Sequence, residues 1–293
     1  MPLFPSPTSK FHDNTYPSLP PRRPKPSAEG KSNLVTGGGT GIGAETARHF
    51  AEAGAARVAL LGRRKQPLLD TKTSIEQKFP GTSVFVVSAD VTKKQQVDDA
   101  FDEHAKAEKI DVVVSNAAMT GPIEPVGGVG SEAFMDAIDF NRRGSLYVAQ
   151  AFLRHASVNA TAIEINSSAA HVSFGPGVAS YSVAKLAVFR LWDTITVSNP
   201  NISVFHVQPG VVDTDMDKAV GGVAAVGHED HVSLPASFNV WLASPEAQRL
   251  ARESRSSIPF RGKYLWANWD VNELKTRTEE IRDSEFLSIG LVR

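Results

Sequence analysis

The sequence predicts an α/β protein in which one doubly wound parallel sheet carries helices on both faces. Apolar, strand-like runs alternate along the chain with amphipathic helical patterns, which is the order that a parallel sheet requires. Several of these runs are continuous and β-branched, as expected of strands buried on both faces. A glycine-rich turn follows the first run and opens a helical pattern. In such a sheet, a ligand binds at the carboxyl ends of the strands.

The predicted elements follow one another from residue 34 to residue 207. The strand-like runs lie at 34–35, 58–61, 84–87, 112–114, 162–165 and 202–207. Helical patterns lie between them, at about 42–53, 67–79, 93–107, 131–155 and 180–197. Polar Ser32 and Asn33 stand where a buried strand is ordinarily apolar, which leaves the length of the first strand open.

The two ends of this pattern differ from its centre. Residues 1–29 hold eight of the 18 prolines, and proline disfavours both helix and sheet. We therefore predict a disordered, Pro-rich tail over 1–29 and one folded domain over 30–293. The stretch 20–24, Pro-Pro-Arg-Arg-Pro, allows a docking motif for a proline-binding domain, but a plain flexible tail is the favoured hypothesis. The segment 211–235 has weak periodicity and predicts a mobile lid over the ligand cleft.

The composition argues against several classes of function. The formal net charge is −1, from 31 basic and 32 acidic side chains, which gives no attraction to nucleic acid or anionic lipid. The lack of cysteine excludes disulfides, thiolate nucleophiles and cysteine zinc sites, and it suits a reducing, cytoplasmic location. No apolar run approaches the roughly 20 residues of a membrane span, and no secretory signal is recognisable. We expect no nucleic-acid or membrane partner and no metal.

Five glycines stand in the eight residues from Thr36 to Gly43, Thr-Gly-Gly-Gly-Thr-Gly-Ile-Gly. Glycine permits positive φ and a close approach to a pyrophosphate, and the helix that follows offers free N–H groups. The spacing differs from G-x-G-x-x-G, and the Gly-Lys-Ser/Thr of a nucleotide triphosphate loop is missing. A flexible turn without a ligand is the minor alternative. The pattern Thr36-Gly37-x-x-x-Gly41-Ile42-Gly43 resembles the cofactor signature of the short-chain dehydrogenase/reductase family, and the resemblance extends from about residue 30 to residue 266.

This resemblance implies a Rossmann-type fold and a nicotinamide dinucleotide cofactor. The residues expected to hold the pyrophosphate end are Gly37, Thr40, Gly41 and Ile42. About twenty residues further on, an NAD enzyme carries an Asp or Glu for the ribose 2′-OH, but here Gly62 stands there and Arg63-Arg64 follow. A guanidinium offers charge and bidentate hydrogen bonds to a 2′-phosphate, and no carboxylate repels it. We therefore expect NADP(H) rather than NAD(H), with the 2′-phosphate bound by Arg63 and assisted by Arg64. The alternative is that both arginines are solvated and bind no phosphate.

Two further strand ends resemble family positions. Asp90 matches the family's Asp that bonds the adenine amino group, although an Asp here also suits a helix cap. Ser115-Asn116-Ala117-Ala118 resembles the family's Asn-Asn-Ala-Gly motif and departs from it at two places. The resemblance implies that Asn116 stabilises the central sheet through backbone hydrogen bonds. Ala118 adds a methyl group near the cofactor ribose.

Tyr181-Ser182-Val183-Ala184-Lys185 is the most specific pattern in the chain. Residues four apart on a helix share one face, so Tyr181 and Lys185 can point into one site. An unperturbed phenol titrates near pH ~10, and a nearby ammonium favours the phenolate, which eases proton transfer at neutral pH. Alone, the pair also suits an amphipathic surface. Both residues are expected to contact the cofactor as well.

Two more residues match the family's catalytic set. Ser168 stands thirteen residues before Tyr181, which is the family's spacing, and its hydroxyl can bond the substrate oxygen. Ser167 is the alternative. Asn141 matches the family's helix Asn, whose implied role is to hold a water that relays protons from Lys185; a bland exposed Asn is the alternative. The implied mechanism transfers a hydride to the substrate carbonyl carbon and a proton from Tyr181 to its oxygen.

The last family motif is Pro-Gly-Val-Val-Asp-Thr at 209–214, which resembles Pro-Gly-x-x-x-Thr. The backbone near Val212 and the hydroxyl of Thr214 are expected to bond the nicotinamide carboxamide, while a plain strand end is the alternative. The substrate pocket is expected at 119–122, 170–178 and 211–235. His228 and His231 suggest metal ligands, but a solvated polar loop is the favoured hypothesis.

Three functions remain open at this point. The favoured one is an NADP(H)-dependent oxidoreductase that acts on a carbonyl or secondary alcohol of a small organic substrate. The alternatives are a dehydratase or isomerase that uses Tyr181 as acid and base, and a cofactor-sensing protein without turnover. The resemblance also implies a homodimer or homotetramer formed through the helices at 131–155 and 180–197, where Phe189, Leu191 and Trp192 serve either as interface or as core.

Overall fold

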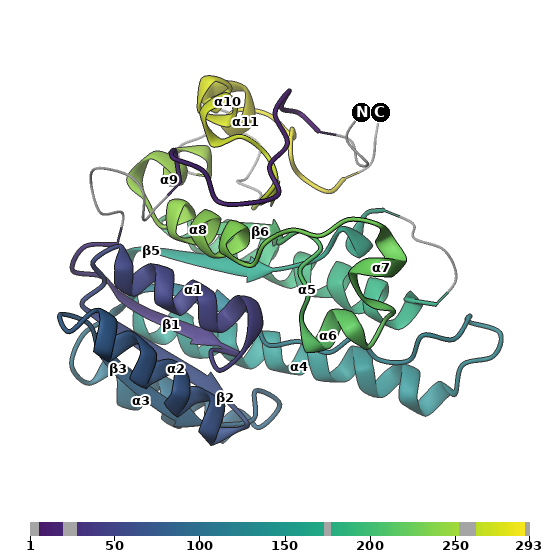
Figure 1. The fold of residues 1–293 in the computed structure, drawn as a ribbon, viewed down its shortest axis with the longest axis horizontal. Coiled ribbons are helices and arrows are strands. Elements are labelled where there is room, and N and C mark those ends of the chain that lie inside the picture. Colours follow the sequence, from purple (N-terminus) through teal and green to yellow (C-terminus); the bar gives the residue numbers. More distant parts are fainter. Residues whose placement is uncertain (1–5, 20–27, 173–176, 252–261, 291–293) are drawn as a thin grey trace.

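The computed structural model describes residues 6–19, 28–172, 177–251 and 262–290 of the 293-residue chain. Its centre is a seven-stranded parallel sheet with the strand order β3-β2-β1-β4-β5-β6-β7 (Figure 1). The strands are β1 (Ser32–Thr36), β2 (Arg57–Gly62), β3 (Ser83–Ser88), β4 (Ile110–Ser115), β5 (Ala156–Ile165), β6 (Ser203–Gln208) and β7 (Lys263–Trp266). The strand order reverses between β1 and β4, so connections diverge there and leave a crevice at the carboxyl ends. The predicted doubly wound, Rossmann-type sheet is confirmed.

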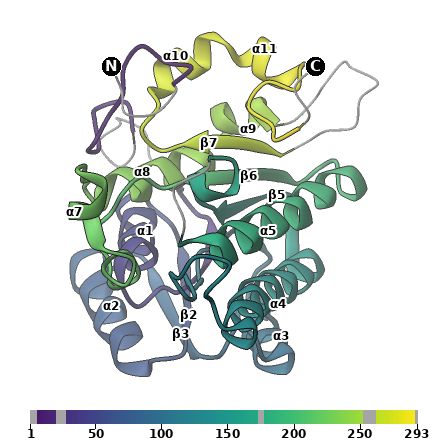
Figure 2. The same ribbon diagram turned by 90° about the vertical axis from the view of Figure 1, so that its right-hand side faces the viewer.

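Helices cover both faces of the sheet, as the view in Figure 2 shows. One face carries α1, α2 and α8, and the other carries α3, α4 and α5. These six are α1 (Gly41–Glu52), α2 (Lys65–Lys78), α3 (Lys94–Ala105), α4 (Ser131–His155), α5 (Ala179–Ser198) and α8 (Ser233–Leu242). The shorter helices are the 3-10 turn η1 (Ser168–Ala170), α6 (Asp215–Lys218), α7 (Gly222–Val226), α9 (Pro245–Ala251), α10 (Val271–Thr276) and α11 (Thr278–Arg282).

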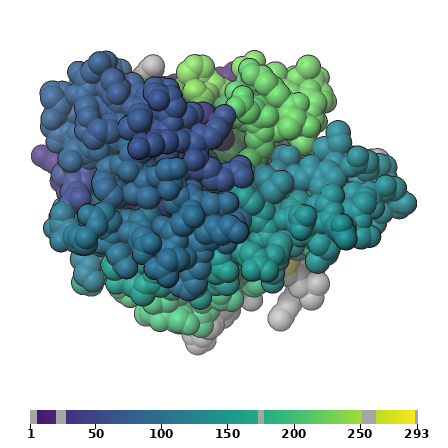
Figure 3. Space-filling model, turned by 90° about the horizontal axis from the view of Figure 1, so that it is seen from below, coloured from purple at the N-terminus to yellow at the C-terminus, as the bar shows by residue number. Residues whose placement is uncertain are grey.

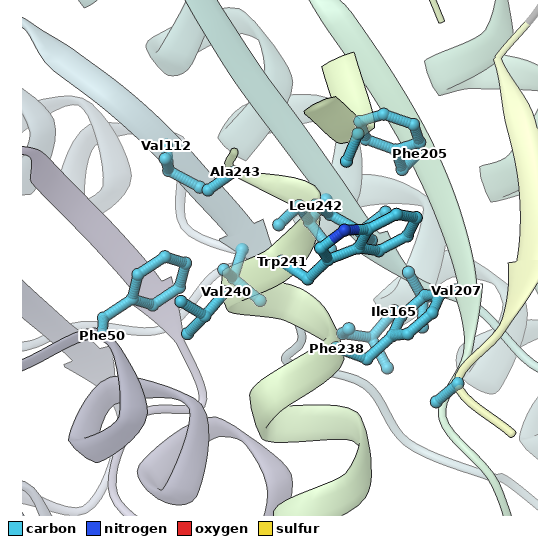
Figure 4. Close-up of a cluster of buried hydrophobic side chains, with 14 of the residues drawn as sticks. Phe50, Val112, Ile165, Phe205, Val207, Phe238, Val240, Trp241, Leu242 and Ala243 are labelled. Atoms are coloured by element: carbon cyan, nitrogen blue, oxygen red, sulfur yellow. The ribbon is translucent and has the colours of Figure 1, made fainter. Parts of the chain in front are cut away.

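Each face of the sheet has its own hydrophobic core. Phe238 and Trp241 of α8 pack toward the sheet, near Ile165, Phe205 and Val207, with their ring centroids 5.2 Å apart (Figure 4). On the other face, Phe101, Phe152 and Trp192 are fully buried. Each large apolar side chain buried in this way contributes about 2 kcal/mol, so the two layers hold the helices firmly to the sheet. The carboxyl edge of the strands is left for ligand binding.

The predicted strands and helices are all present, and the helix expected over 131–155 is α4 with the same bounds. The sequence interpretation missed β7 and the four helices from α8 to α11. In α8 every residue is buried, so no polar face reveals the helical period. The strand β7 has only four residues, too few for a pattern to stand out.

The first strand begins at Ser32, and all five of its residues are buried. The Ser32 hydroxyl lies 3.1 Å from Nε2 of His104, and the Ser32 N–H donates to Asp111. The side-chain oxygen and nitrogen of Asn33 are buried and have no hydrogen-bond partner in the described part of the chain. The two polar residues therefore belong to the strand.

Residues 6–19 differ from the predicted disordered tail, because they lie against the C-terminal segment. Phe11 forms an antiparallel bridge with Trp269, and Nε2 of His12 lies 2.8 Å from Oδ2 of Asp270. Most of these contacts use backbone groups and polar side chains, which a proline-rich segment can supply without helix or strand. We call residues 6–19 the N-terminal strap.

The segment 211–235, predicted as a lid, contains α6, α7 and the start of α8. It lies near the carboxyl ends of the strands, at the right of Figure 1. The docking motif proposed for residues 20–24 falls outside the described residues. Among the helices in the described ranges, none is both long enough and apolar enough to cross a membrane.

Candidate active site

The glycine-rich turn between β1 and α1 is built from backbone alone. Gly37 and Gly41 have φ of +67° and +53°, which side chains with a Cβ rarely adopt. A Cβ on Gly43 would lie 2.3 Å from the carbonyl oxygen of Gly37, so the helix packs directly on the turn. The first N–H groups of α1, next to Thr40 and Ile42, have no partner within the helix and leave positive potential at this end.

A cavity of about 430 Å³ lies against this turn. Its walls include Gly37 and Thr40 from the turn, Gly62 to Arg64 after β2, and Phe140 from α4. In the space-filling view, the region around α2 in dark blue and the segment 211–235 in green stand on either side of a recess (Figure 3). The cavity therefore extends from the glycine turn to Arg63, the residue predicted to bind the 2′-phosphate.

Arg63 and Arg64 are both exposed, but their surroundings differ. The guanidinium carbon of Arg63 lies 5.5 Å from the centroid of the Phe140 ring, at the cavity wall. The guanidinium of Arg64 lies 4.0 Å from the carboxylate of Asp215 in α6, and both side chains are solvated. An exposed pair of this kind contributes little to stability.

Asp90 forms a tight turn after β3. Its Oδ1 accepts hydrogen bonds from the N–H and the hydroxyl of Thr92, at 2.9 and 2.8 Å. Burial would raise the pKa of the Asp90 carboxyl, but these bonds and the charge of Arg63 hold it below its ordinary value. Asp90 caps this turn and not α3, which begins at Lys94.

Asn116 joins the ends of β4 and β1. Its side-chain nitrogen donates to the carbonyl oxygen of Thr36 at 2.9 Å, and its backbone N–H donates to the Thr36 hydroxyl at 2.9 Å. A Cβ on Gly37 would lie 2.7 Å from this side-chain nitrogen. Asn116 therefore closes the sheet directly behind the glycine turn.

Tyr181 and Lys185 lie one turn apart on α5. The Nζ of Lys185 lies 5.6 Å from the centroid of the Tyr181 ring and donates a hydrogen bond to the carbonyl oxygen of Ile165 at 2.5 Å. Lys185 is only 4% exposed, so its charge is poorly screened, while Tyr181 is half-buried. Ser168 is also buried, in the turn after β5, where its N–H donates to Oε1 of Gln208 at 2.6 Å. The helix and the strand end thus hold the predicted phenol, ammonium and hydroxyl in one region.

Asn141 is buried within α4 and bonds the loop after β4. Its side-chain nitrogen donates to the carbonyl oxygens of Met119 and Ala137, each at 2.8 Å. Its side-chain oxygen accepts from the N–H of Met119 at 3.2 Å. Both amide hydrogens are therefore used within the protein, and the predicted contact to a relay water stays a prediction.

The Pro-Gly segment after β6 reaches back to the glycine turn. A Cβ on Gly41 would lie 3.2 Å from Cγ2 of Thr214, whose hydroxyl also accepts from the N–H of Asp217. The Val211 N–H donates to the Asp230 carboxylate at 2.7 Å, and the Asp230 N–H donates to the Val211 carbonyl. Burial raises the pKa of Asp230, although these and other hydrogen bonds oppose the rise. Val212, which is predicted to contact the nicotinamide, is buried next to the residues that form these Val211–Asp230 hydrogen bonds.

Sequence interpretation missed a row of buried polar side chains next to Lys185. Glu164 of β5 stands in register with His206 of β6, which stands in register with Tyr264 of β7. All three are buried, and Oε1 of Glu164 lies 4.0 Å from Nζ of Lys185. The sequence carries a signal for this row, because Glu164 and His206 are polar residues within two runs that predict buried strands.

A second cavity, of about 480 Å³, lies between β7, the C-terminal segment and the N-terminal strap. Its aromatic lining includes Tyr264, Trp266 and Trp269. His171, which follows η1, packs edge-on against Tyr264 with ring centroids 4.5 Å apart, and burial lowers its pKa. Residues 173–176 of the predicted substrate lining fall outside the described residues.

The histidines of the segment 211–235 form local contacts. His228 lies 2.9 Å from Oδ1 of Asp230, and His231 lies 2.7 Å from the Ser233 hydroxyl. Within the described ranges, no group of three or more histidines and carboxylates is placed to hold a metal ion.

Comparison with known proteins connects this site to other chains. A family model described as short chain dehydrogenase matches residues 31–222. A short chain dehydrogenase/reductase of Claviceps purpurea is 30% identical over 294 residues, which cover 99% of this chain and 95% of that protein. One from Aspergillus aculeatus is 31% identical and covers 99% of this chain and 98% of its own length.

Solved structures have the same fold. A short-chain type dehydrogenase/reductase from Mycobacterium marinum is 27% identical, with a TM-score of 0.70, and the match covers 76% of this chain and 91% of that chain. A blue fluorescent protein from a metagenomic library, solved in complex with NADPH, is 25% identical, with a TM-score of 0.69. That match covers 82% of this chain and 97% of the other. The range matched by the family model includes every candidate site residue from Gly37 to Thr214.

Proposed function

The chain belongs to the short-chain dehydrogenase/reductase family, and we propose that within this family of oxidoreductases it uses NADP(H) to reduce or oxidise a small organic substrate. The reacting group is a carbonyl or a secondary alcohol. The observation that carries this proposal is the buried ammonium of Lys185, 5.6 Å from the Tyr181 ring and beside a strand end that bears Ser168. An ammonium next to a phenol favours proton transfer near neutral pH.

The residues around the 430 Å³ cavity fit a dinucleotide. The close packing of Gly43 on Gly37 leaves only backbone in the turn, so phosphate oxygens can approach the N-terminus of α1. Gly37, Thr40, Gly41 and Ile42 would hold the pyrophosphate, Asp90 and Asn116 the region around the adenosine, and Val212 and Thr214 the nicotinamide end. The bound cofactor supplies the hydride.

The choice of NADP(H) depends on Arg63. No acidic residue stands at the end of β2, where Gly62 is followed by two arginines. Both arginines line the cavity, but the Arg63 guanidinium lies over the Phe140 ring, while that of Arg64 lies 4.0 Å from the carboxylate of Asp215. The NADPH complex of the structurally similar blue fluorescent protein supports the same choice.

In the reductive direction, the Ser168 and Tyr181 hydroxyls donate hydrogen bonds to the substrate carbonyl oxygen. Tyr181 transfers its proton to this oxygen as the carbon is reduced, and the ammonium of Lys185 stabilises the phenolate that remains. Lys185 is also expected to bond the nicotinamide ribose. Asn141 holds the loop at Met119 in place, and its predicted water would return a proton through Lys185.

A turnover experiment tests the proposal. The purified protein is mixed with NADPH and a panel of ketones, and both the loss of NADPH and the alcohol formed are measured. We expect equal amounts of the two, with NADH less effective. The second candidate, a dehydratase or isomerase that uses Tyr181 as acid and base, is favoured instead if product forms without any change in nicotinamide absorbance.

We further propose a cytoplasmic homodimer or homotetramer that pairs through α4 and α5. Phe189 and Trp192 are fully buried in the chain's own core, so they serve as core. The exposed apolar side chains on α5 are Val183, Leu186 and Val197, and these are the expected contacts. Light scattering on the purified protein and on Leu186→Glu tests this assembly.

A further inference from the structure

Glu164, His206 and Tyr264 form a polar row on the face of the sheet that α5 covers. They stand in register on β5, β6 and β7, and the ring of Phe189 from α5 lies 4.3 Å from that of His206. Glu164 is 1% exposed and His206 is 0% exposed. Strands at the centre of a parallel sheet are ordinarily apolar, and a buried carboxylate is costly unless it is compensated. The groups that stabilise the buried carboxylate of Glu164 therefore indicate the role of this row.

The two oxygens of Glu164 have different partners. Oε2 accepts a hydrogen bond from Nδ2 of Asn166 at 2.7 Å and lies 3.0 Å from Nδ1 of His206. Oε1 is buried and has no hydrogen-bond partner among the described residues, but it lies 4.0 Å from Nζ of Lys185. One oxygen is thus held by Asn166 and His206, and the other lies near the ammonium.

The position of Lys185 completes the arrangement. Its Nζ donates to the carbonyl oxygen of Ile165 in β5 and lies 4.0 Å from Oε1 of Glu164 and 5.6 Å from the centroid of the Tyr181 ring. Water does not screen charges buried this deeply, so the interaction of the carboxylate with the ammonium is strong. A carboxylate at this distance offsets part of the positive charge that Tyr181 experiences.

We propose that Glu164 is a positioning residue of the active site, the buried counter-ion of Lys185 that limits how strongly this ammonium favours the Tyr181 phenolate. His206 and Asn166 hold the carboxylate in place. The inference rests on the proposed role of Tyr181 as proton donor. Without the counter-ion, the phenol would lose its proton at lower pH and would be a poorer donor for carbonyl reduction.

The other titratable groups around Glu164 do not replace it. In the described residues these are His206 from β6, Tyr264 from β7, and Lys185 and Tyr181 from α5. Burial, and next the charge of Glu164, raise the pKa of Tyr264 well above its ordinary value, so Tyr264 stays protonated. Nδ1 of His206 lies 3.0 Å from Glu164, and its Nε2 has no partner in the described ranges. None of these four groups is a carboxylic acid. Glu164 is therefore the negative charge of the row.

The test measures the ionisation of Tyr181 without turnover. Tyrosinate absorbance is followed against pH for wild type and for Tyr181→Phe, and the difference isolates Tyr181. The same difference is taken between Glu164→Gln and Glu164→Gln/Tyr181→Phe. We expect the midpoint of Tyr181 to fall by about one pH unit in the Gln background, because a nearby negative charge has been removed. An unchanged or higher midpoint overturns the proposal.

Two further variants keep the test decisive if Glu164→Gln unfolds. Glu164→Asp retains the charge but withdraws it by one methylene, so the midpoint should fall in the same direction by less than half as much. His206→Asn retains Glu164 and a donor near the position of Nδ1, so its midpoint should match wild type. The assignment to the charge of Glu164 is contradicted if the Tyr181 midpoint does not shift in Glu164→Asp. It is also contradicted if the midpoint shifts by about one pH unit in His206→Asn.

Kinetics then connect the row with the reaction. For ketone reduction, the alkaline limb of kcat/KM in Glu164→Gln should move down by the same amount as the Tyr181 midpoint. A purely structural role for Glu164 would lower activity without moving this limb. If the protein reduces no ketone, the proposed function fails, while the absorbance titration still decides the role of Glu164.

Discussion

His104 and His206 are both fully buried, but one packs from a helix against β1 and the other lies within β6, and they have different partners. His104 of α3 lies 3.1 Å from the Ser32 hydroxyl of β1, and burial, followed by the charge of Arg57, lowers its pKa to about 4. His206 of β6 lies 3.0 Å from the carboxylate of Glu164. The half with the glycine turn thus buries a neutral ring, while the half that packs against α5 buries a ring beside the Glu164–Lys185 pair.

The difference follows from what each half does. In the proposed function, the β1–β4 half would bind the cofactor pyrophosphate with the backbone of the glycine turn, so its buried side chains need no charge. The β5–β7 half would favour one protonation state of the Tyr181 phenol, and the proposed means are the ammonium of Lys185 and its counter-ion Glu164. Buried polar groups in the first half should therefore affect mainly the free energy of unfolding. Those in the second half should affect the protonation of Tyr181 and the reaction rate.

The largest expected effect comes from Tyr181→Phe. Loss of the general acid should lower kcat for ketone reduction about 1,000-fold. The affinity for NADPH, measured by calorimetry, should stay close to wild type, because the glycine turn is untouched. Tyr147→Phe, at a half-buried position on α4, is the control and should keep its activity. If Tyr181→Phe weakens NADPH binding as well as lowering kcat, the separation of cofactor binding and chemistry between the two halves of the sheet is contradicted.

The second effect concerns acid stability and His104. Because its folded pKa is lowered from 6.5 to about 4, the neutral ring is favoured in the folded state. The stability is fully present above the unfolded pKa and is lost as pH falls through this window, by about 3 kcal/mol in total. Urea unfolding at pH values on both sides of the window should show this loss in wild type and a smaller loss in His104→Gln. His155→Gln, at the end of α4, should behave as wild type; equal acid sensitivity in His104→Gln would contradict the assignment.

The sequence was informative where backbone patterns decide structure. The glycine turn, the helix with Tyr181 and Lys185, and the alternation of strands and helices follow from spacing and periodicity, which are local properties. The contacts of the strap and of Glu164 could not be predicted, because they join residues far apart in the chain. Phe11 meets Trp269, and Glu164 meets His206 only after β5 and β6 pair.

The third effect separates cofactor recognition from chemistry. Arg63→Asp removes the expected contact to the 2′-phosphate and adds repulsion, so NADPH affinity should fall about 30-fold or more while NADH affinity changes little. Calorimetric titration with both cofactors measures the two losses. Arg64→Asp is the matched control and should discriminate less, because Arg64 lies near Asp215. Equal losses for NADPH and NADH would refute the role of Arg63.

The smallest expected effect concerns Asn33 in β1, whose side-chain oxygen and nitrogen lack partners among the described residues. Asn33 stands in register with Val58 and Val112, two members of the core, so a leucine of similar shape can pack there. Removal of an unsatisfied buried amide should stabilise the protein by about 1 kcal/mol, which raises Tm by about 2 °C.

Ser32→Ala is the matched control for Asn33→Leu, because it removes a polar group that is bonded, to His104, and should destabilise by about 1 kcal/mol. Thermal unfolding of both variants gives the two signs. If Asn33→Leu also lowers Tm, the amide of Asn33 contributes to stability, and the first half of the sheet depends on its buried polar groups as much as the second. Opposite signs for neighbouring residues of β1 would instead show that polarity in this half is useful only where it is paired.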